Sequence, residues 1–449
     1  MEREKKRQRT RKRFVWNRQV LFGILLTGVV LIVMCVVGYA LSLGSGIPDA
    51  RDGQQGEQLF ATAMTTEPPT TEPPTTEPPT TEPPETSTAP KSELPTEPSE
   101  PEYVLQAQEL LETMTLEEKI WQMIFLTQEE LTDTMGTQYA GEGTREALRQ
   151  YPIGGVIYFS GNISSEGQLR DLISNTQSFS KIPLMIGVDE EGGRVSRLSG
   201  IGVTDYVAPM ASYGSARDEK AVYDLGQHFA ESLIDMGFNV NYAPVADIVT
   251  NPDNTEIGDR SFSEDPTVAA AMVVQMVKGM QDGGLVSCLK HFPGHGSTSA
   301  DSHYGMSVSQ RSLEELRGAE FIPFTAGIEA GAELVMMSHM SLPKVTGSDV
   351  PCDLSYEVVT GLLRRELGFE GVIISDSHEM AAITAYYSCG EAAVLAVKAG
   401  CDVVLMPESK QAAANALLEA VADGTLSEAR INESVLRILS LKYEYGIIE

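Results

Sequence analysis

The chain has 449 residues, 42% of them hydrophobic, which is enough for one α/β barrel with appendages or for two or three ordinary domains. Its formal net charge is −30, but residues 1–19 carry nine Lys or Arg and two Glu, so the remainder is close to −37 and no nucleic-acid partner is expected. Five scattered cysteines, with no CxxC and no spaced Cys/His pattern, exclude a disulfide framework and predict no metal site.

The first predicted element is a membrane anchor at residues 20–43. These 24 residues contain no charge, and at about 1.5 Å per residue they can cross a hydrocarbon core of roughly 30 Å. Residues 1–19 form a basic tail before it, so the positive-inside rule predicts a cytoplasmic tail, a single-pass cell-membrane protein and an extracellular body. A cleaved signal peptide is the alternative, but its apolar segment usually has about 7–15 residues. We expect an uncleaved transmembrane helix.

Residues 44–102 read as a disordered Pro/Thr/Glu-rich linker. The sequence Thr-Thr-Glu-Pro-Pro occurs four times between Thr65 and Pro84. Proline at this density prevents helices and sheets, and glutamates of like charge repel one another, so an extended spacer is expected.

Residues 103–449 alternate short apolar runs with helix-length segments, which predicts a (β/α)₈ TIM-like barrel. A helix is expected to start at Thr115. The expected strands are Met123–Leu126, Gly155–Phe159, Pro183–Val188, Asn239–Val249, Val286–Leu289, Leu334–Met337, Gly371–Ile374 and Asp402–Met406, and the clearest helices are Asp218–Met236, Pro266–Gly283, Ser312–Ala330 and Tyr356–Leu367. A doubly wound open sheet is the alternative, although no GxGxxG follows a first strand.

Polar side chains gather where these strands are expected to end, namely Asp189, Lys290, His291, Ser338, His339 and Asp376. Barrel active sites form at that face. The densest group is Lys290-His291-Phe292-Pro293-Gly294-His295-Gly296, a loop expected to begin at Lys290, followed by Asp301-Ser302-His303. Three of the six histidines fall in these fourteen residues. An imidazole held by a carboxylate can transfer protons near neutral pH.

At these motifs the chain resembles the family 3 glycoside hydrolases, in the single-barrel β-N-acetylglucosaminidase (β-N-acetylhexosaminidase) branch. The likeness spans roughly residues 103 to 449. It rests on Lys290–Gly296, Asp301–His303, Val188-Asp189-Glu190-Glu191-Gly192-Gly193-Arg194-Val195, Gly258-Asp259-Arg260-Ser261-Phe262, and Ser375-Asp376 with Met380. The chain departs from the family at Ser377-His378-Glu379, where smaller or more apolar residues are expected.

The resemblance implies a retaining exo-enzyme that removes terminal β-linked N-acetylhexosamine from peptidoglycan fragments or related glycans, without metal or cofactor. It assigns Asp376 as nucleophile, His303 as general acid/base and Asp301 as the residue orienting it. It further implies that the residues contacting the sugar are Asp189, Arg197, Arg260, Lys290 and His291.

Several of these residues also have a structural interpretation. Asp376 suits a helix N-cap, and Glu379 is a second candidate carboxylate. Asp301 and His303 suit a turn. Arg260 and Arg197 suit loop salt bridges, with Asp259 or Glu264 as expected partners. His295 is expected in packing or behind the site, and His228 and Trp121 in structural roles.

Two other functions remain open from the sequence. The same site can transfer the sugar to phosphate, as in a phosphorylase, since a histidine does not repel that anion as a carboxylate does. A catalytically silent glycan-binding surface module is the other alternative.

Overall fold

A computed structural model describes residues 100–298 and 305–449. The predicted basic tail, the predicted anchor and all but the last residues of the predicted linker lie outside this range, as do Asp301 and His303. Among the helices that the structure describes, none is both long and apolar enough to cross a membrane. The anchor at residues 20–43 therefore stays a prediction.

The body of the chain is a parallel eight-stranded sheet in the order β10-β1-β2-β3-β6-β7-β8-β9. The strands are β1 (Ile124–Thr127), β2 (Gly155–Tyr158), β3 (Met185–Val188), β6 (Val240–Asn241), β7 (Val286–Phe292), β8 (Leu334–Met337), β9 (Val372–Ile374) and β10 (Val404–Leu405). A parallel bridge between Ile374 and Val403 joins the two ends of the sheet. The predicted TIM-like barrel is confirmed, and the open-sheet alternative is wrong.

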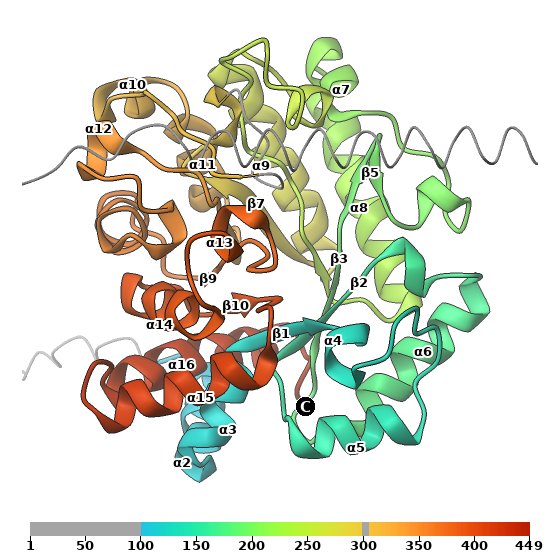
Figure 1. Cartoon of the computed structure of the whole chain (residues 1–449). Coiled ribbons are helices and arrows are strands. Elements are labelled where there is room, and N and C mark those ends of the chain that lie inside the picture. Colours follow the sequence, from blue (N-terminus) through green and yellow to red (C-terminus); the bar gives the residue numbers. More distant parts are fainter. Residues whose placement is uncertain (1–99, 299–304) are drawn as a thin grey trace, which may run out of the picture. The chain divides into compact units, whose positions relative to one another are not determined.

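Helices surround the strands (Figure 1). They are α2 (Glu102–Thr113), α3 (Leu116–Gln122), α4 (Gln128–Thr132), α5 (Glu142–Gln150), α6 (Glu166–Phe179), α7 (Met210–Ala216), α8 (Glu219–Met236), α9 (Pro266–Asp282), α10 (Leu313–Gly318), α11 (Phe321–Glu329), α12 (Pro343–Thr346), η6 (Glu357–Glu366), α13 (Ala381–Thr384), α14 (Cys389–Ala399), α15 (Lys410–Ala422) and α16 (Glu428–Glu444). Their starts follow the sequence: Thr115 and Glu118 form a capping box on α3, and Asp218 caps α8.

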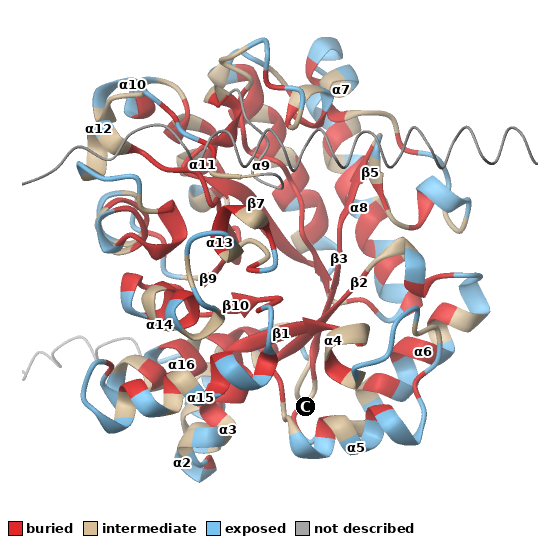
Figure 2. Cartoon of the chain, in the orientation of Figure 1, coloured by how far each residue is buried: buried red, intermediate tan, exposed pale blue. Residues whose placement is uncertain are grey.

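The core fills the space between strands and helices. Every residue of β1, β2, β3 and β7 is buried, as expected for a parallel sheet covered on both sides. Figure 2 shows this burial in the strands, with exposure confined to the outer helix faces and loops. Trp121 lies in this core, so its expected structural role is confirmed, and Cys288 and Cys401 are buried there too.

Three predicted elements differ from the structure. The run Asn239–Val249 forms only the short strand β6, because the Ala243 N–H bonds back to Asn241 O and interrupts the ladder, which resumes as a single bridge between Val245 and Lys290. The run Ser312–Ala330 divides into α10 and α11, since Ala319 leaves the helical conformation between them. Strand β7 continues to Phe292, so Lys290 and His291 do not begin a loop but lie inside the strand.

Candidate active site

A cavity of about 640 Å³ lies at the carboxyl ends of the barrel strands, within the usual size of a small-molecule site. Its lining residues come from most of the strand ends, and include Phe159, Asp189, Glu191, Arg197, Glu256, Arg260, Lys290, His291, His295, Asp376, Ser377, Glu379 and Met406. All six site residues that were predicted within the described range, Asp189, Arg197, Arg260, Lys290, His291 and Asp376, therefore share one cavity.

Asp189 follows β3 directly and lies between two cations. Lys290 Nζ lies 2.7 Å from Asp189 Oδ1, and Arg197 Nη2 lies 3.1 Å from Oδ2. Burial raises the pKa of Asp189, but the two positive charges outweigh it, so the net pKa is lowered and the carboxylate is ionised. Its remaining lone pairs can accept hydrogen bonds from the hydroxyl groups of a sugar.

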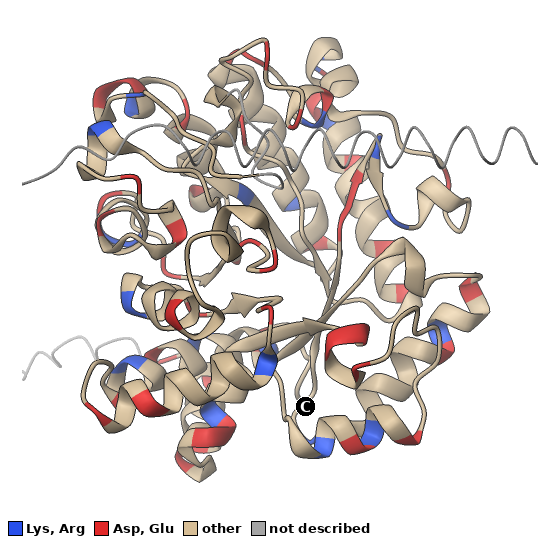
Figure 3. Cartoon of the chain, viewed as in Figure 1, with Lys and Arg blue, Asp and Glu red and all other residues tan. Residues whose placement is uncertain are grey.

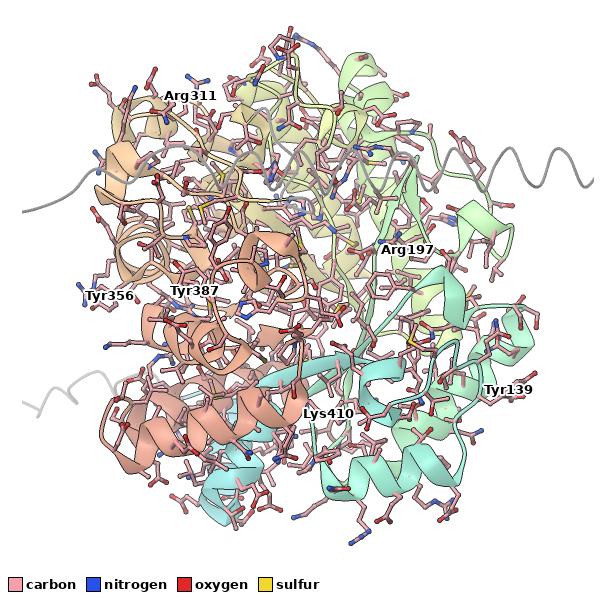
Figure 4. The ribbon with its side chains drawn as sticks, viewed as in Figure 1. Tyr139, Arg197, Arg311, Tyr356, Tyr387 and Lys410 are labelled. Carbon is pink, nitrogen blue, oxygen red and sulfur yellow. The ribbon has the colours of Figure 1, made fainter. Side chains whose placement is uncertain are left out.

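Arg197 is held by the hairpin of β4 (Glu190–Gly192) and β5 (Val195–Ser196). The turn needs glycine, since Gly192 and Gly193 have φ angles of 90° and 59°. The buried Glu190 carboxylate then accepts hydrogen bonds from the backbone N–H groups of Arg197 and Leu198, at 2.7 and 2.9 Å. The guanidinium carbon of Arg197, which is labelled in Figure 4, lies 5.1 Å from the centroid of the Phe159 ring.

Glu191 links the two basic residues of the cavity floor. Arg260 binds it with two hydrogen bonds, Nε to Oε2 at 2.8 Å and Nη2 to Oε1 at 2.9 Å, and Lys290 Nζ lies 2.7 Å from Oε1. Arg260 Nη1 also contacts Glu256 Oε1 at 3.2 Å. The expected partners of Arg260, Asp259 and Glu264, are wrong; Asp259 instead lies 3.5 Å from Arg194.

These contacts fix the charge of the network. Burial lowers the pKa of Lys290, but the carboxylates of Asp189 and Glu191 outweigh it and raise the net pKa above its usual value. Burial likewise raises the pKa of Glu191, and Arg260 with Lys290 bring it well below its usual value. The cavity floor is therefore a rigid set of ionised donors and acceptors.

The two described histidines of the densest motif meet at Asp247. His291 Nδ1 lies 2.8 Å from Asp247 Oδ2, and the His295 backbone N–H donates to Oδ1 at 2.6 Å. The other nitrogen of His291, Nε2, lies 3.5 Å from the Arg260 guanidinium, which favours a lone pair there. Burial lowers the pKa of His295 to about 4, so its ring is neutral at pH 7, and its buried Nε2 has no hydrogen-bond partner in the part of the chain that the structure describes.

Asp376 lies two residues after the end of β9. Its Oδ1 accepts the Ser377 N–H at 2.7 Å, and within the described residues no Lys, Arg or His forms an ion pair with it. The N-cap interpretation is wrong, because α13 begins only at Ala381, with Met380 at its N-cap. Glu379 also lines the cavity, and burial followed by the charge of Glu408 raises its pKa.

Glu191 and Asp247 were not singled out from the sequence. Glu191 belongs to a motif with two adjacent glutamates that nothing local distinguishes. Asp247 is an isolated carboxylate in the apolar run Val245–Ile248, which is the one signal that identifies it. The predicted pair Asp301 and His303 lies outside the described residues. Those residues contain no group of His, Cys, Asp and Glu suited to a metal ion.

Comparison with known proteins agrees with this geometry. The model of the glycosyl hydrolase family 3 N-terminal domain matches residues 115–441. A β-hexosaminidase of Stenotrophomonas maltophilia is 34% identical over 69% of this chain and 97% of that protein, and β-hexosaminidase A of Pseudoalteromonas piscicida is 32% identical over 66% of this chain. The chain spans only 54% of the latter.

A solved structure of a family 3 β-N-acetylglucosaminidase from a Paenibacillus species superposes with a TM-score of 0.70. It is 37% identical and covers 75% of this chain, which spans 63% of that one. The chain belongs to glycosyl hydrolase family 3 and, within that family, to the β-hexosaminidase branch.

Proposed function

We propose that the chain is a retaining exo-β-N-acetylglucosaminidase whose nucleophile is Asp376. One observation carries the assignment: Asp376 shares a cavity with a set of ionised hydrogen-bond donors and acceptors, yet no Lys, Arg or His of the described residues forms an ion pair with it. The Stenotrophomonas and Paenibacillus relatives support the same chemistry by their names.

In the first step Asp376 attacks the anomeric carbon while the bond to the aglycone breaks, leaving a glycosyl ester on the carboxylate. The departing oxygen takes a proton from an acid, the role that the resemblance gives to His303 oriented by Asp301. In the second step that base removes a proton from water, which displaces Asp376 and releases the sugar with retained configuration. Asp189, Lys290, Arg260 and His291 bind hydroxyl groups and fix the ring.

The described Asp–His pair, Asp247 with His291, is not the acid in this proposal. Its Nε2 faces a guanidinium, so that nitrogen accepts rather than donates. It is suited to bind a sugar hydroxyl.

The substrate class we propose is terminal β-linked N-acetylglucosamine on peptidoglycan fragments or related glycans. The uncharged residues 20–43 and the basic tail before them support anchoring in the cell membrane, with the barrel outside.

A chromogenic panel tests the activity. The 4-nitrophenyl β-glycosides of N-acetylglucosamine, glucose and xylose are compared with the full chain, each with and without phosphate. Turnover of the N-acetylglucosaminide well above the others, with free sugar as product in both buffers, supports the proposal. A preference for glucoside refutes the substrate, sugar 1-phosphate as product shows a phosphorylase, and binding without turnover shows a silent glycan-binding module.

A further inference from the structure

Three side chains without a role in the proposed mechanism meet directly beneath the nucleophile. They are His339, two residues after β8; Asp353 in the short helix η5 (Cys352–Leu354); and His378, two residues after Asp376. His339 and Asp353 are wholly buried, and His378 is 2% exposed. His378 belongs to the stretch in which the sequence departs from its family.

The two histidines share one carboxylate. His378 Nε2 lies 3.0 Å from Asp353 Oδ2, and His339 Nδ1 lies 3.1 Å from Oδ1. The His339 contact is an ion pair off the ideal hydrogen-bond line, and neither of its two atoms has a hydrogen-bond partner among the described residues. The two rings lie 5.5 Å apart between centroids. Asp353 thus joins the connection after β8, to which it belongs together with His339, to the connection after β9.

His339 is charged in this arrangement. Its second nitrogen, Nε2, lies 2.8 Å from the carbonyl oxygen of Ser377, so both ring nitrogens face acceptors and both need a proton. Burial lowers the pKa of His339, but the Asp353 carboxylate, with smaller contributions that include Asp376 and the Ser377 carbonyl, raises it to about 9. The imidazolium donates to Ser377.

Ser377 in turn holds the nucleophile. Its N–H donates to Asp376 Oδ1 at 2.7 Å, while its carbonyl accepts from His339. The next backbone N–H, that of His378, donates to Leu405 O in β10 at 3.0 Å. The peptide after Asp376 is therefore fixed by β8, η5 and β10 together.

A buried ion pair of this kind is a poor choice for stability alone. Desolvating both charges costs free energy, and apolar side chains of similar volume often serve a core equally well or better. Fixing a reacting group is a different matter, because a displacement of about 1 Å can cost on the order of a hundredfold in rate. The position of the three residues, below the cavity and not in contact with it, fits the second purpose.

We propose that His339, Asp353 and His378 are positioning residues that hold the Asp376 carboxylate in line with the anomeric carbon. The inference rests on the proposed function, since it assumes Asp376 as nucleophile. The residues that bind the sugar lie on or after other strands, so losing this cluster should slow the attack and leave sugar binding intact.

The test compares His339→Gln, Asp353→Asn and His378→Gln in the full-length chain, with His228→Gln in α8 as the matched control. Four quantities are measured: kcat and KM for 4-nitrophenyl N-acetyl-β-glucosaminide, the rate of covalent labelling by a 5-fluoro-N-acetylglucosaminyl fluoride, the Kd of N-acetylglucosamine, and the thermal midpoint. Each cluster variant should lose about tenfold to a hundredfold in kcat and in labelling rate, with KM and Kd changed by less than about threefold. His228→Gln should behave as wild type.

The double variant His339→Gln/Asp353→Asn should be no slower than about the worse single variant, because the cluster acts as a unit. Folded variants with wild-type labelling rates would overturn the proposal. Increases in KM and Kd by the same factor as the decrease in kcat would also overturn it. If His339→Gln fails to fold, Asp353→Asn and His378→Gln decide by the same criteria. A wild-type chain that neither turns over nor labels refutes the proposed function itself, which the variants' rates alone cannot do.

Discussion

At the scale of single residues, the carboxylates of the cavity fall into two groups, those with a Lys or Arg ion-pair partner and those without one. Asp189, Glu191 and Glu256 are bound by Lys or Arg, whereas Asp376 and Glu379 have no such ion pair among the described residues. Asp376 directly follows a barrel strand and a buried serine, and Glu379 is on a more exposed turn. The more rigid carboxylate is the better nucleophile.

Asp376→Asn should therefore lower kcat at least about a thousandfold, because the amide cannot form the glycosyl ester. Its Kd for N-acetylglucosamine should stay near wild type, which shows that the cavity survives. Glu379→Gln is the matched control and should keep most of its turnover. An active Asp376→Asn beside an inactive Glu379→Gln would move the nucleophile to Glu379.

The acid/base assignment of His303 has its own test, because proton donation matters most for poor leaving groups. His303→Ala should lose on the order of a hundredfold or more in kcat/KM with a natural disaccharide and much less with a 2,4-dinitrophenyl glycoside. His291→Ala, which removes a sugar-binding ring, should lose equally on both. Equal losses in His303→Ala would assign His303 to binding instead.

Residue types, strand ends and the family resemblance were enough to predict six of the polar residues that line the cavity. The six predicted residues were recognisable because each carries a polar group where an apolar run stops, or belongs to a motif of the family. Glu191 and Asp247 could not be predicted in the same way. Their importance comes from Arg260 and His291, which are 69 and 44 residues away along the chain.

At the scale of elements, periodicity predicted the strands well where they are short and wholly apolar, and β8 was predicted to the residue. It was misleading where the chain changes direction inside an apolar run. The local turn at Ala243 interrupts the ladder of β6. Strand β7 tolerates Lys290 and His291 because Asp189, Glu191 and Asp247 satisfy them. Such compensation by distant partners has no local sequence signal.

Helix α16 contains a buried lysine, Lys442, whose protonation makes the stability of the fold depend on pH. Lys442 is wholly buried, and among residues 100–298 and 305–449 its Nζ has Gln122 Oε1, at 2.8 Å, as its hydrogen-bond partner. Burial lowers its pKa from 10.5 to about 7. Between these values the unfolded chain binds a proton that the folded chain does not. The contribution of Lys442 to the free energy of unfolding should therefore rise with pH, by up to about 1.4 kcal/mol per unit.

The measurement is denaturant unfolding at pH 7.5, 8.5 and 9.5. The free energy of unfolding of wild type, minus that of Lys442→Met, should increase across this series. The exposed Lys398→Met in α14 is the control, and its difference from wild type should stay constant. A constant difference for Lys442→Met would show that the folded chain keeps this lysine protonated.

At the scale of the whole molecule, the parallel barrel brings one end of every strand to the same face. All cavity-lining residues lie between Ile157 and Met406. Lys and Arg are interspersed with Asp and Glu on outer helices such as α5 and α16 (Figure 3).

Because all cavity-lining residues come from the barrel, residues 103–449 expressed alone should be folded and should keep the kcat and KM of the full chain. A fragment that folds with a much higher KM would show that earlier residues contribute to the site.

The orientation that we propose for the chain in the membrane is inferred from charge, and external proteolysis of intact cells tests it. The basic residues 1–19 before an uncharged segment predict that residues 44–449 lie outside, and the proline-rich composition of residues 44–102 predicts an accessible backbone there. A broad-specificity protease should release active enzyme by cutting between Thr65 and Pro101, while a cytoplasmic marker stays intact. N-terminal sequencing of the released fragment locates the cut. Enzyme that is protected until the cells are lysed would place the barrel in the cytoplasm and reverse the predicted topology.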